Sequence, residues 1–309
     1  MRLRRSAFTL VELVVALAIA GIATGLMTAT LTRQQRFFSS AEEVLAVRAH
    51  LRDGADILAS DIRSAAVAQF GLPVMTDTAV EMITVIGSSV ACQSPSGETV
   101  GLPPSELVSG NTLTSMLVMP DTGDLAGIYT MPGGIPDSAR WETFRIAGFA
   151  ARAIASSCPS STGFVTPADE FAGATGFLLT LASTPPAQVR AGSIVHFLRR
   201  ARYSLYRSSD GDWYLGYRRC GIAAPHACGS IQPVSGPYRP YRTGGPSGMS
   251  FRYYDRAASE ISGASSVNVA RVDIVLRGET RSPISLTGDS RRVWRDSVIV
   301  SVSPRNRTR

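Results

Sequence analysis

The stretch FTLVELVVALAIAGIATGLMTATLT, residues 8–32, decides the fold of this 309-residue chain. A helix that crosses a bilayer needs about 20 apolar residues, and this stretch is long enough. Its single charged residue is Glu12, and arginines flank it on both sides: Arg2, Arg4, Arg5, Arg33 and Arg36. A carboxylate in an apolar span costs about 2.5–3.5 kcal/mol at the helix centre and less near an end. We therefore expect Glu12 to have a partner from outside the span.

The residues around Glu12 resemble the start of type IV prepilins and of the pseudopilins of type II secretion. That start has a short basic leader, a small residue, a Phe, then Thr-Leu-x-Glu and a long apolar run. Here these positions are Ala7, Phe8 and residues 9–12, and Ala7 stands where the family usually has Gly. The resemblance implies that a prepilin peptidase cuts between Ala7 and Phe8 and that the new amino group is methylated.

The resemblance also implies a role for Glu12 in assembly. In a filament of pilins, this carboxylate would face the terminal ammonium of a neighbouring subunit and fix its axial register. Gly21 and Gly25 form a small-xxx-small pair, which lets helices pack closely. The implied topology is a single pass of the inner membrane, with a cytoplasmic N terminus and a periplasmic head.

Two simpler explanations of the span are an ordinary signal peptide and a plain membrane anchor. A signal peptide would have a shorter apolar core and a cleavage site at its far end, and no clean site follows Thr32. An anchor explains the length and the basic flank. It does not explain the order Phe-Thr-Leu-x-Glu.

The helix is predicted to continue beyond the span, to about residue 66. Residues 33–68 lack proline, and apolar residues recur at helical spacing: Leu45, Leu51, Ala55, Leu58 and Ile62. Gly71 and Pro73 are expected to end the helix. The alternative is two helices with a break near Gln34.

The rest of the chain predicts a β-rich head. Residues 80–86, 113–119, 176–183 and 194–198 are expected strands, and Asp210-Gly211 predicts a hairpin over residues 202–219. Three alternating strands follow near residues 249–254, 270–277 and 297–303. Long loops are expected at 94–104, 120–134, 156–167 and 236–248. The layout resembles the heads of PilW-type minor pilins and of the J-type pseudopilin.

The predicted class is therefore α+β and pilin-like, a long helix packed on a mostly antiparallel sheet. We expect four parts: a leader at 1–7, a transmembrane and assembly half of the helix at 8–32, an amphipathic half at 33–68 and a periplasmic head at 69–309.

Four cysteines predict disulfides in an exported head: Cys92, Cys158, Cys220 and Cys228. Four cysteines allow three pairings. Cys220 with Cys228 is favoured because glycines and a proline mark a tight loop there, which leaves Cys92 with Cys158. The spacing lacks a Cys-x-x-Cys pair, so we expect no metal site.

Composition and motifs do not nominate an enzyme. The formal net charge is +7, but the arginines are scattered along the sequence. They therefore do not indicate a nucleic-acid partner, and that alternative stays open. The three histidines, at 50, 196 and 226, fall in no catalytic motif, and no cofactor is expected. Two hypotheses remain. The first is a minor pilin or pseudopilin that joins other pilins in a hetero-oligomeric tip complex and primes assembly. The second is a membrane-anchored enzyme or binding domain with a pilin-like leader.

Overall fold

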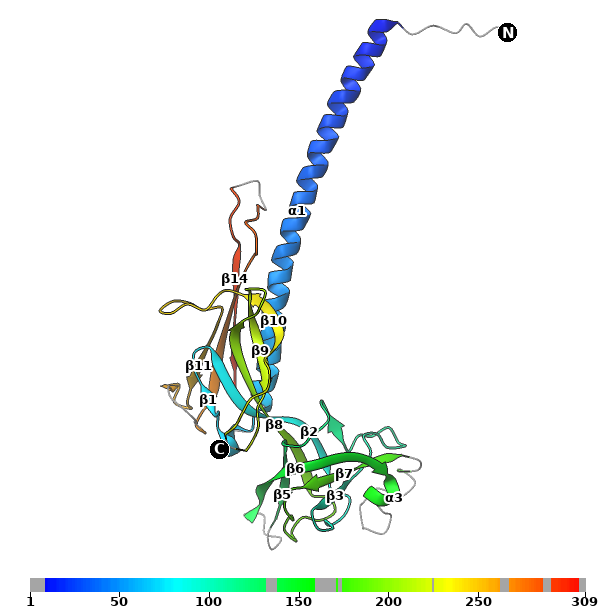
Figure 1. Cartoon of the computed structure of the whole chain (residues 1–309), viewed down its shortest axis with the longest axis vertical. Coiled ribbons are helices and arrows are strands. Elements are labelled where there is room, and N and C mark those ends of the chain that lie inside the picture. Colours follow the sequence, from blue (N-terminus) through cyan, green and yellow to red (C-terminus); the bar gives the residue numbers. More distant parts are fainter. Residues whose placement is uncertain are drawn as a thin grey trace, which may run out of the picture.

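The computed structural model describes residues 9–131, 138–158, 171, 174–223, 225–261, 267–285 and 290–305. The fold is α+β and pilin-like: one long N-terminal helix leads into a head of antiparallel β-sheet (Figure 1). This confirms the fold class that the sequence predicts. The cleavage residues Ala7 and Phe8 lie outside the described residues.

The long helix is α1 (Leu10–Ser64), which has 55 residues and a length of about 83 Å. It is continuous through Gln34, so the alternative of two helices is wrong. It ends earlier than predicted, because Ala65 is extended and forms an isolated bridge with Thr84 of the sheet. The backbone therefore leaves the helix at Ala65 and pairs with the sheet. Gly71, which was expected to end the long helix, ends the short helix α2 (Val67–Phe70).

The second half of α1 buries one apolar stripe against the head. Its core positions are Val44, Val47, Leu51, Ala55, Leu58 and Ile62. They recur every three or four residues, as an amphipathic helix requires. Leu45 is 64% exposed, so its predicted place in the stripe is wrong and its neighbour Val44 is buried there instead.

The head contains two sheets, and every pairing between the described strands is antiparallel. The larger sheet consists of β1 (Val74–Met75), β2 (Ala79–Val90), β3 (Thr99–Leu102), β4 (Ser115–Met116), β5 (Leu125–Thr130), β6 (Arg140–Ala153), β7 (Thr175–Leu181), β8 (Ile194–Arg207), β9 (Trp213–Arg219) and β10 (Gln232–Tyr238). The smaller sheet consists of β11 (Met249–Tyr254), β12 (Glu260–Ile261), β13 (Arg271–Glu279) and β14 (Arg295–Val302).

Two large apolar cores divide the head into lobes, which Figure 1 shows at an angle to each other. In the helix lobe, α1 packs on the smaller sheet and on the near ends of β2 and β8. In the distal lobe, the far ends of the same two strands pack with β3, β5, β6 and β7. Because β2 and β8 pass through both cores, they hold the two lobes together.

Several expected loops and strands are wrong in detail. The predicted strand at 113–119 is reduced to β4, since Leu117 leaves the sheet and is 83% exposed. The predicted loops at 94–104 and 120–134 contain β3 and β5, which are largely buried. Strand β6 was not predicted. The Asp210-Gly211 hairpin is confirmed, with Arg207 opposite Trp213 and Gly211 at a positive φ of 91°.

Candidate functional site

The first turn of α1 holds Glu12 in a capping box. The Thr9 backbone N–H donates to Glu12 Oε2 at 3.0 Å, and the Thr9 hydroxyl donates to the same oxygen at 2.9 Å. In return, the Glu12 N–H donates to Thr9 Oγ1 at 3.3 Å. Thr at the cap and Glu three residues later form this reciprocal pair in many helices. The carboxylate is therefore held at the helix terminus, close to the chain end where cleavage would occur.

One face of the apolar span carries small and hydroxyl-bearing residues. Gly21, Thr24, Gly25, Thr28, Ala29 and Thr32 line a shallow strip along the helix. The hydroxyls of Thr24, Thr28 and Thr32 each donate to the carbonyl four residues earlier, so they need no partner in a bilayer. A Cβ added at Gly21 or Gly25 would meet no other atom of the chain. The strip is open to another helix.

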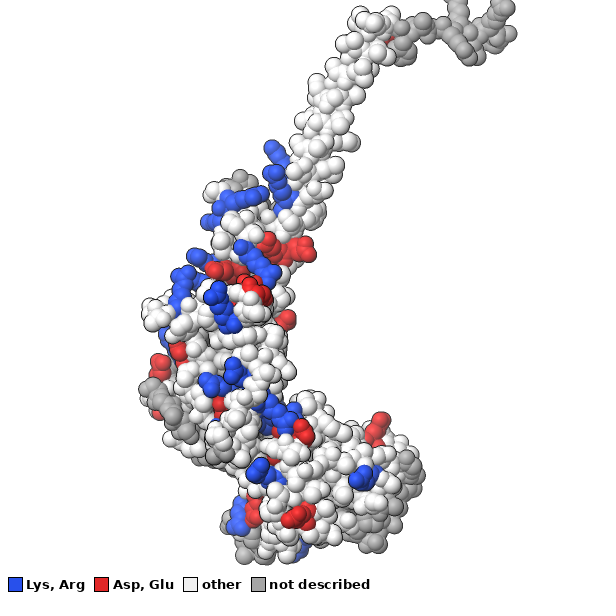
Figure 2. Space-filling model, viewed as in Figure 1, with Lys and Arg blue, Asp and Glu red and all other residues white. Residues whose placement is uncertain are grey.

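The polarity of α1 changes sharply along its length. The helix is long and apolar enough to cross a membrane, and its most apolar window is not buried against the head. Figure 2 shows the upper helix almost free of charged residues, since none lies between Glu12 and Arg33, whereas charges of both signs begin below it and are scattered over the head. Together with the N-terminal motif, this pattern fits anchoring in the inner membrane.

A partly buried hydrogen bond joins α1 to the head. The Tyr203 hydroxyl of β8 donates to Asp61 Oδ2 at 2.6 Å. Burial raises the pKa of the Asp61 carboxyl, although the bond from Tyr203 lowers it in part. Burial and the nearby Asp61 charge together raise the pKa of Tyr203. The phenol is therefore a permanent donor, and it fixes the end of α1 on the sheet.

An ion network lies where the two lobes meet. Asp124 is 2% exposed and accepts from Arg199 Nη2 at 2.7 Å and from Arg219 Nη2 at 3.1 Å. Arg219 also bonds Asp121 at 2.9 Å, and Arg199 Nη2 donates to the carbonyl of Met119 at 3.1 Å. Burial opposes the charge of Arg199, but the Asp124 carboxylate outweighs it and raises the pKa of the guanidinium. Separating Asp124 from its arginines would leave an uncompensated buried charge, which costs free energy. The network therefore holds the loop before β5 against β8 and β9.

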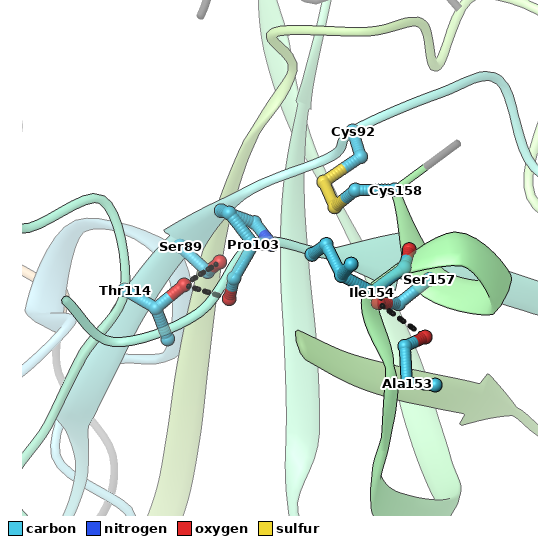
Figure 3. The surroundings of a disulfide bond; sticks show 8 residues. All are labelled: Ser89, Cys92, Pro103, Thr114, Ala153, Ile154, Ser157 and Cys158. Atoms are coloured by element: carbon cyan, nitrogen blue, oxygen red, sulfur yellow. Dashed lines mark hydrogen bonds between the residues drawn. A yellow bond between two sulfur atoms is a disulfide. The ribbon is translucent and has the colours of Figure 1, made fainter. Parts of the chain in front are cut away.

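The described cysteines form two disulfides, Cys92–Cys158 and Cys220–Cys228. Figure 3 shows the first, which ties the chain after β2 to the end of the short helix α3 (Ile154–Ser157). Nearby, the Ser89 and Thr114 hydroxyls lie 2.7 Å apart, and Thr114 donates to the Pro103 carbonyl at 2.8 Å. The second closes the loop after β9.

The described residues bring no catalytic constellation together. His196 stacks on Trp141 with ring centres 4.3 Å apart, and burial lowers its pKa. Glu81 lies near both Cys220 and Cys228 at metal-ligand spacing. Those two sulfurs are bonded to each other, and Glu81 pairs with Arg200, so the group has no free ligand set.

Comparison with known proteins agrees with the N-terminal geometry. Residues 2–28 match the family model described as the prokaryotic N-terminal methylation motif. No curated protein and no solved structure matches the chain significantly. The N-terminal segment, with its apolar helix, is thus similar to that of type IV prepilins.

The sequence anticipated the Glu12 motif but not the contacts that connect the head. Asp61 with Tyr203 and Asp124 with Arg199 are 142 and 75 residues apart. A local pattern carries no signal for either pair. The one available hint is that Asp124 follows a Gly within a predicted loop.

Proposed function

We propose that this chain is a structural subunit of a type IV pilus or of a type II secretion pseudopilus. The observation that carries the proposal is Glu12, the one acidic residue of an apolar span that matches the methylation motif. After cleavage before Phe8, the carboxylate pairs with the terminal ammonium of a neighbouring subunit. The open strip at Gly21 and Gly25 then supports close helix packing.

We also propose that the chain is a minor subunit at the filament tip, where it helps to prime assembly with other pilins. A shaft subunit repeats at close spacing, which favours a compact head. Here a distal lobe projects beyond the helix lobe, as Figure 1 shows. Such a lobe is compatible with a terminal position, where it has no subunit above it.

The assembly role is tested by replacing Glu12 with Leu in the full chain, in cells that assemble the filament. We expect cleavage and both disulfides to be retained, while the amount recovered in sheared filaments falls by at least about tenfold. Glu42→Leu is the matched control, because Glu42 is an exposed carboxylate farther along the same helix. Normal recovery of Glu12→Leu would refute the proposed role of this carboxylate.

The tip location is tested by the copy number of the chain in the same filaments. Quantitative mass spectrometry is expected to find a small number of copies per filament, together with other prepilin-type subunits. A chain that proves the most abundant subunit of the shaft would refute the minor-subunit assignment and leave the pilin assignment intact.

A further inference from the structure

The smaller sheet ends at an open edge. Its order is β12-β11-β13-β14, and within the described part of the chain β14 pairs on one side alone, with β13. An edge strand presents unpaired N–H and C=O groups that another strand can bind. Proteins usually prevent this with short strands, prolines, bulges or covering elements.

The other described edges of this head are blunted in those ways. Strands β1 and β12 have two residues each, and β3 has four and contacts α3. Strand β10 contains Pro233 and Pro237, and its register shifts twice. By contrast, β14 has eight residues, an unbroken register with β13 and no proline. Among the end strands of the two described sheets, β14 is therefore the one with room for a regular partner strand.

The pairing pattern shows which backbone groups of β14 face outward. The Thr280 N–H donates to the Trp294 carbonyl at 3.0 Å, so even-numbered residues of this strand bond to β13. In an antiparallel ladder the bonded and non-bonded pairs alternate. The N–H and C=O groups of Ser297, Ile299 and Ser301 consequently point to the open edge. The Ser297 N–H is occupied by Asp296 Oδ1 at 2.8 Å, whereas Ile299 and Ser301 lie beyond that contact.

Apolar side chains lie on both faces of this edge. Val298 and Val300 pack at the margin of the helix-lobe core, beside Ile57 of α1, and all three remain partly exposed. Ile299 points to the other face and is 69% exposed. A strand added here would cover these residues as well as the backbone groups.

We propose that the open edge of β14 binds an extended strand of a different filament subunit, by strand addition. This inference rests on the proposed function, because it concerns how a pilin-type head meets its neighbour. A partner strand is the occupant that fits, since alternating N–H and C=O groups are complementary to another extended backbone. The backbone of a nucleic acid has no alternating N–H and C=O groups to pair with this edge.

A second copy of this chain does not fit the same edge in an antiparallel arrangement. Asp296 pairs with Arg48 at 3.1 Å, and the Arg305 N–H donates to the Arg63 carbonyl at 3.1 Å. The strand and α1 therefore run in the same direction. Antiparallel pairing of two β14 edges would invert one helix relative to the other and place the two membrane anchors on opposite sides.

Amide hydrogen exchange measures the inference directly on the full chain. Exchange at single residues is compared between the unassembled chain in detergent and the chain in sheared filaments. We expect the Ile299 and Ser301 amides to slow by at least about tenfold on assembly. The Val300 amide, which bonds to β13, is the internal control and stays protected in both states. Unchanged exchange at Ile299 in filaments would overturn the inference.

Proline at the same position provides a second test. Ile299→Pro removes an N–H that the subunit itself does not use, and proline is tolerated at such edges. We expect it to keep both disulfides and lose filament recovery by at least about tenfold, while Ile299→Thr keeps recovery. Val300→Pro removes an N–H that bonds to β13, and it serves as the control that shows how a misfolded head behaves in the same assays.

The outcomes separate this inference from the proposed function. A wild-type chain that is present in filaments with an unprotected Ile299 refutes strand addition alone. A chain absent from filaments refutes both. A disulfide-linked homodimer of an Ile299→Cys variant would show that the occupant is a second copy and overturn the choice of partner.

Discussion

Single carboxylates of this chain serve different purposes because their surroundings differ. Glu12 lies in the first turn of α1, where the Thr9 backbone N–H and hydroxyl donate to its carboxylate. Asp124 is buried and balanced by two arginines. Asp61 is partly buried, and its hydrogen-bond partner is the neutral phenol of Tyr203. When Asp61 is ionised, its hydrogen bond to the neutral Tyr203 supplies no positive charge to balance it. The stability of the head is therefore expected to depend on pH.

Asp61→Asn is expected to raise the melting temperature at pH 7. Burial raises the pKa of Asp61 above its ordinary 3.8, so the folded chain holds this proton more tightly than the unfolded chain. The stabilising contribution is therefore complete below the unfolded pKa and is lost as the pH rises through the folded pKa. Asparagine keeps an oxygen for the Tyr203 hydroxyl and carries no charge at any pH.

The measurement is thermal unfolding of the full chain in detergent at pH 3 and pH 7. The gain from Asp61→Asn should be larger at pH 7 and shrink toward pH 3. Asp56→Asn, at an exposed position five residues earlier in the same helix, is the control and should show little change. A loss of stability of equal size at both pH values would contradict the assignment.

At the scale of elements, α1 uses glycine for two different purposes. A Cβ at Gly54 would overlap the hydroxyl of Tyr238, which donates to the His50 carbonyl at 2.9 Å. A Cβ at Gly21 would meet nothing in the subunit. Gly54 therefore permits close packing of α1 on β10, whereas Gly21 leaves space for a neighbour.

Gly54→Ala is expected to destabilise the head by about 1–3 kcal/mol, as overpacking does. Alanine would otherwise favour a helix by about 1 kcal/mol. Gly21→Ala is the matched variant and should leave unfolding in detergent unchanged or slightly improved, while reducing filament recovery. Denaturant unfolding decides between these outcomes, and a stabilised Gly54→Ala would show that α1 and β10 are not in close contact.

The two disulfides are expected to contribute unequally. They close loops with sequence separations of 66 and 8 residues. Loop-closure entropy predicts about 4 kcal/mol for the longer and about 2.5 kcal/mol for the shorter. Cys92→Ser with Cys158→Ser should therefore lower the unfolding free energy more than Cys220→Ser with Cys228→Ser. Equal effects would argue against the chain-entropy explanation.

The sequence predicts those elements whose signal is local. The apolar span, the continuing stripe through Leu51 and Leu58 and the Asp210-Gly211 hairpin follow from spacing alone. Strands β5 and β6 did not, because β5 lies among Gly and Pro residues that indicate loops. The strand state of β5 depends on pairing with β8, which lies far along the chain, and β6 in turn pairs with β5 and β7. The contact of Asp61 with Tyr203 is equally non-local.

The whole molecule combines an open, apolar half-helix with a two-lobed β-sheet head. The helix half has no covering partner in the described chain, and the second half is tied to the head by its apolar stripe, Asp61 and Gly54. Such a division is typical of a subunit that is extracted from a membrane into a filament.

The central claim is that the chain is processed as a prepilin, and the identity of its mature N terminus tests this most directly. Intact-mass measurement and N-terminal sequencing are made on the chain extracted from membranes of cells with a prepilin peptidase. We predict a mature chain that begins at Phe8 and carries one methyl group on its amino nitrogen. A mature chain that begins beyond Thr32, or an uncut chain in the presence of active peptidase, would contradict the account.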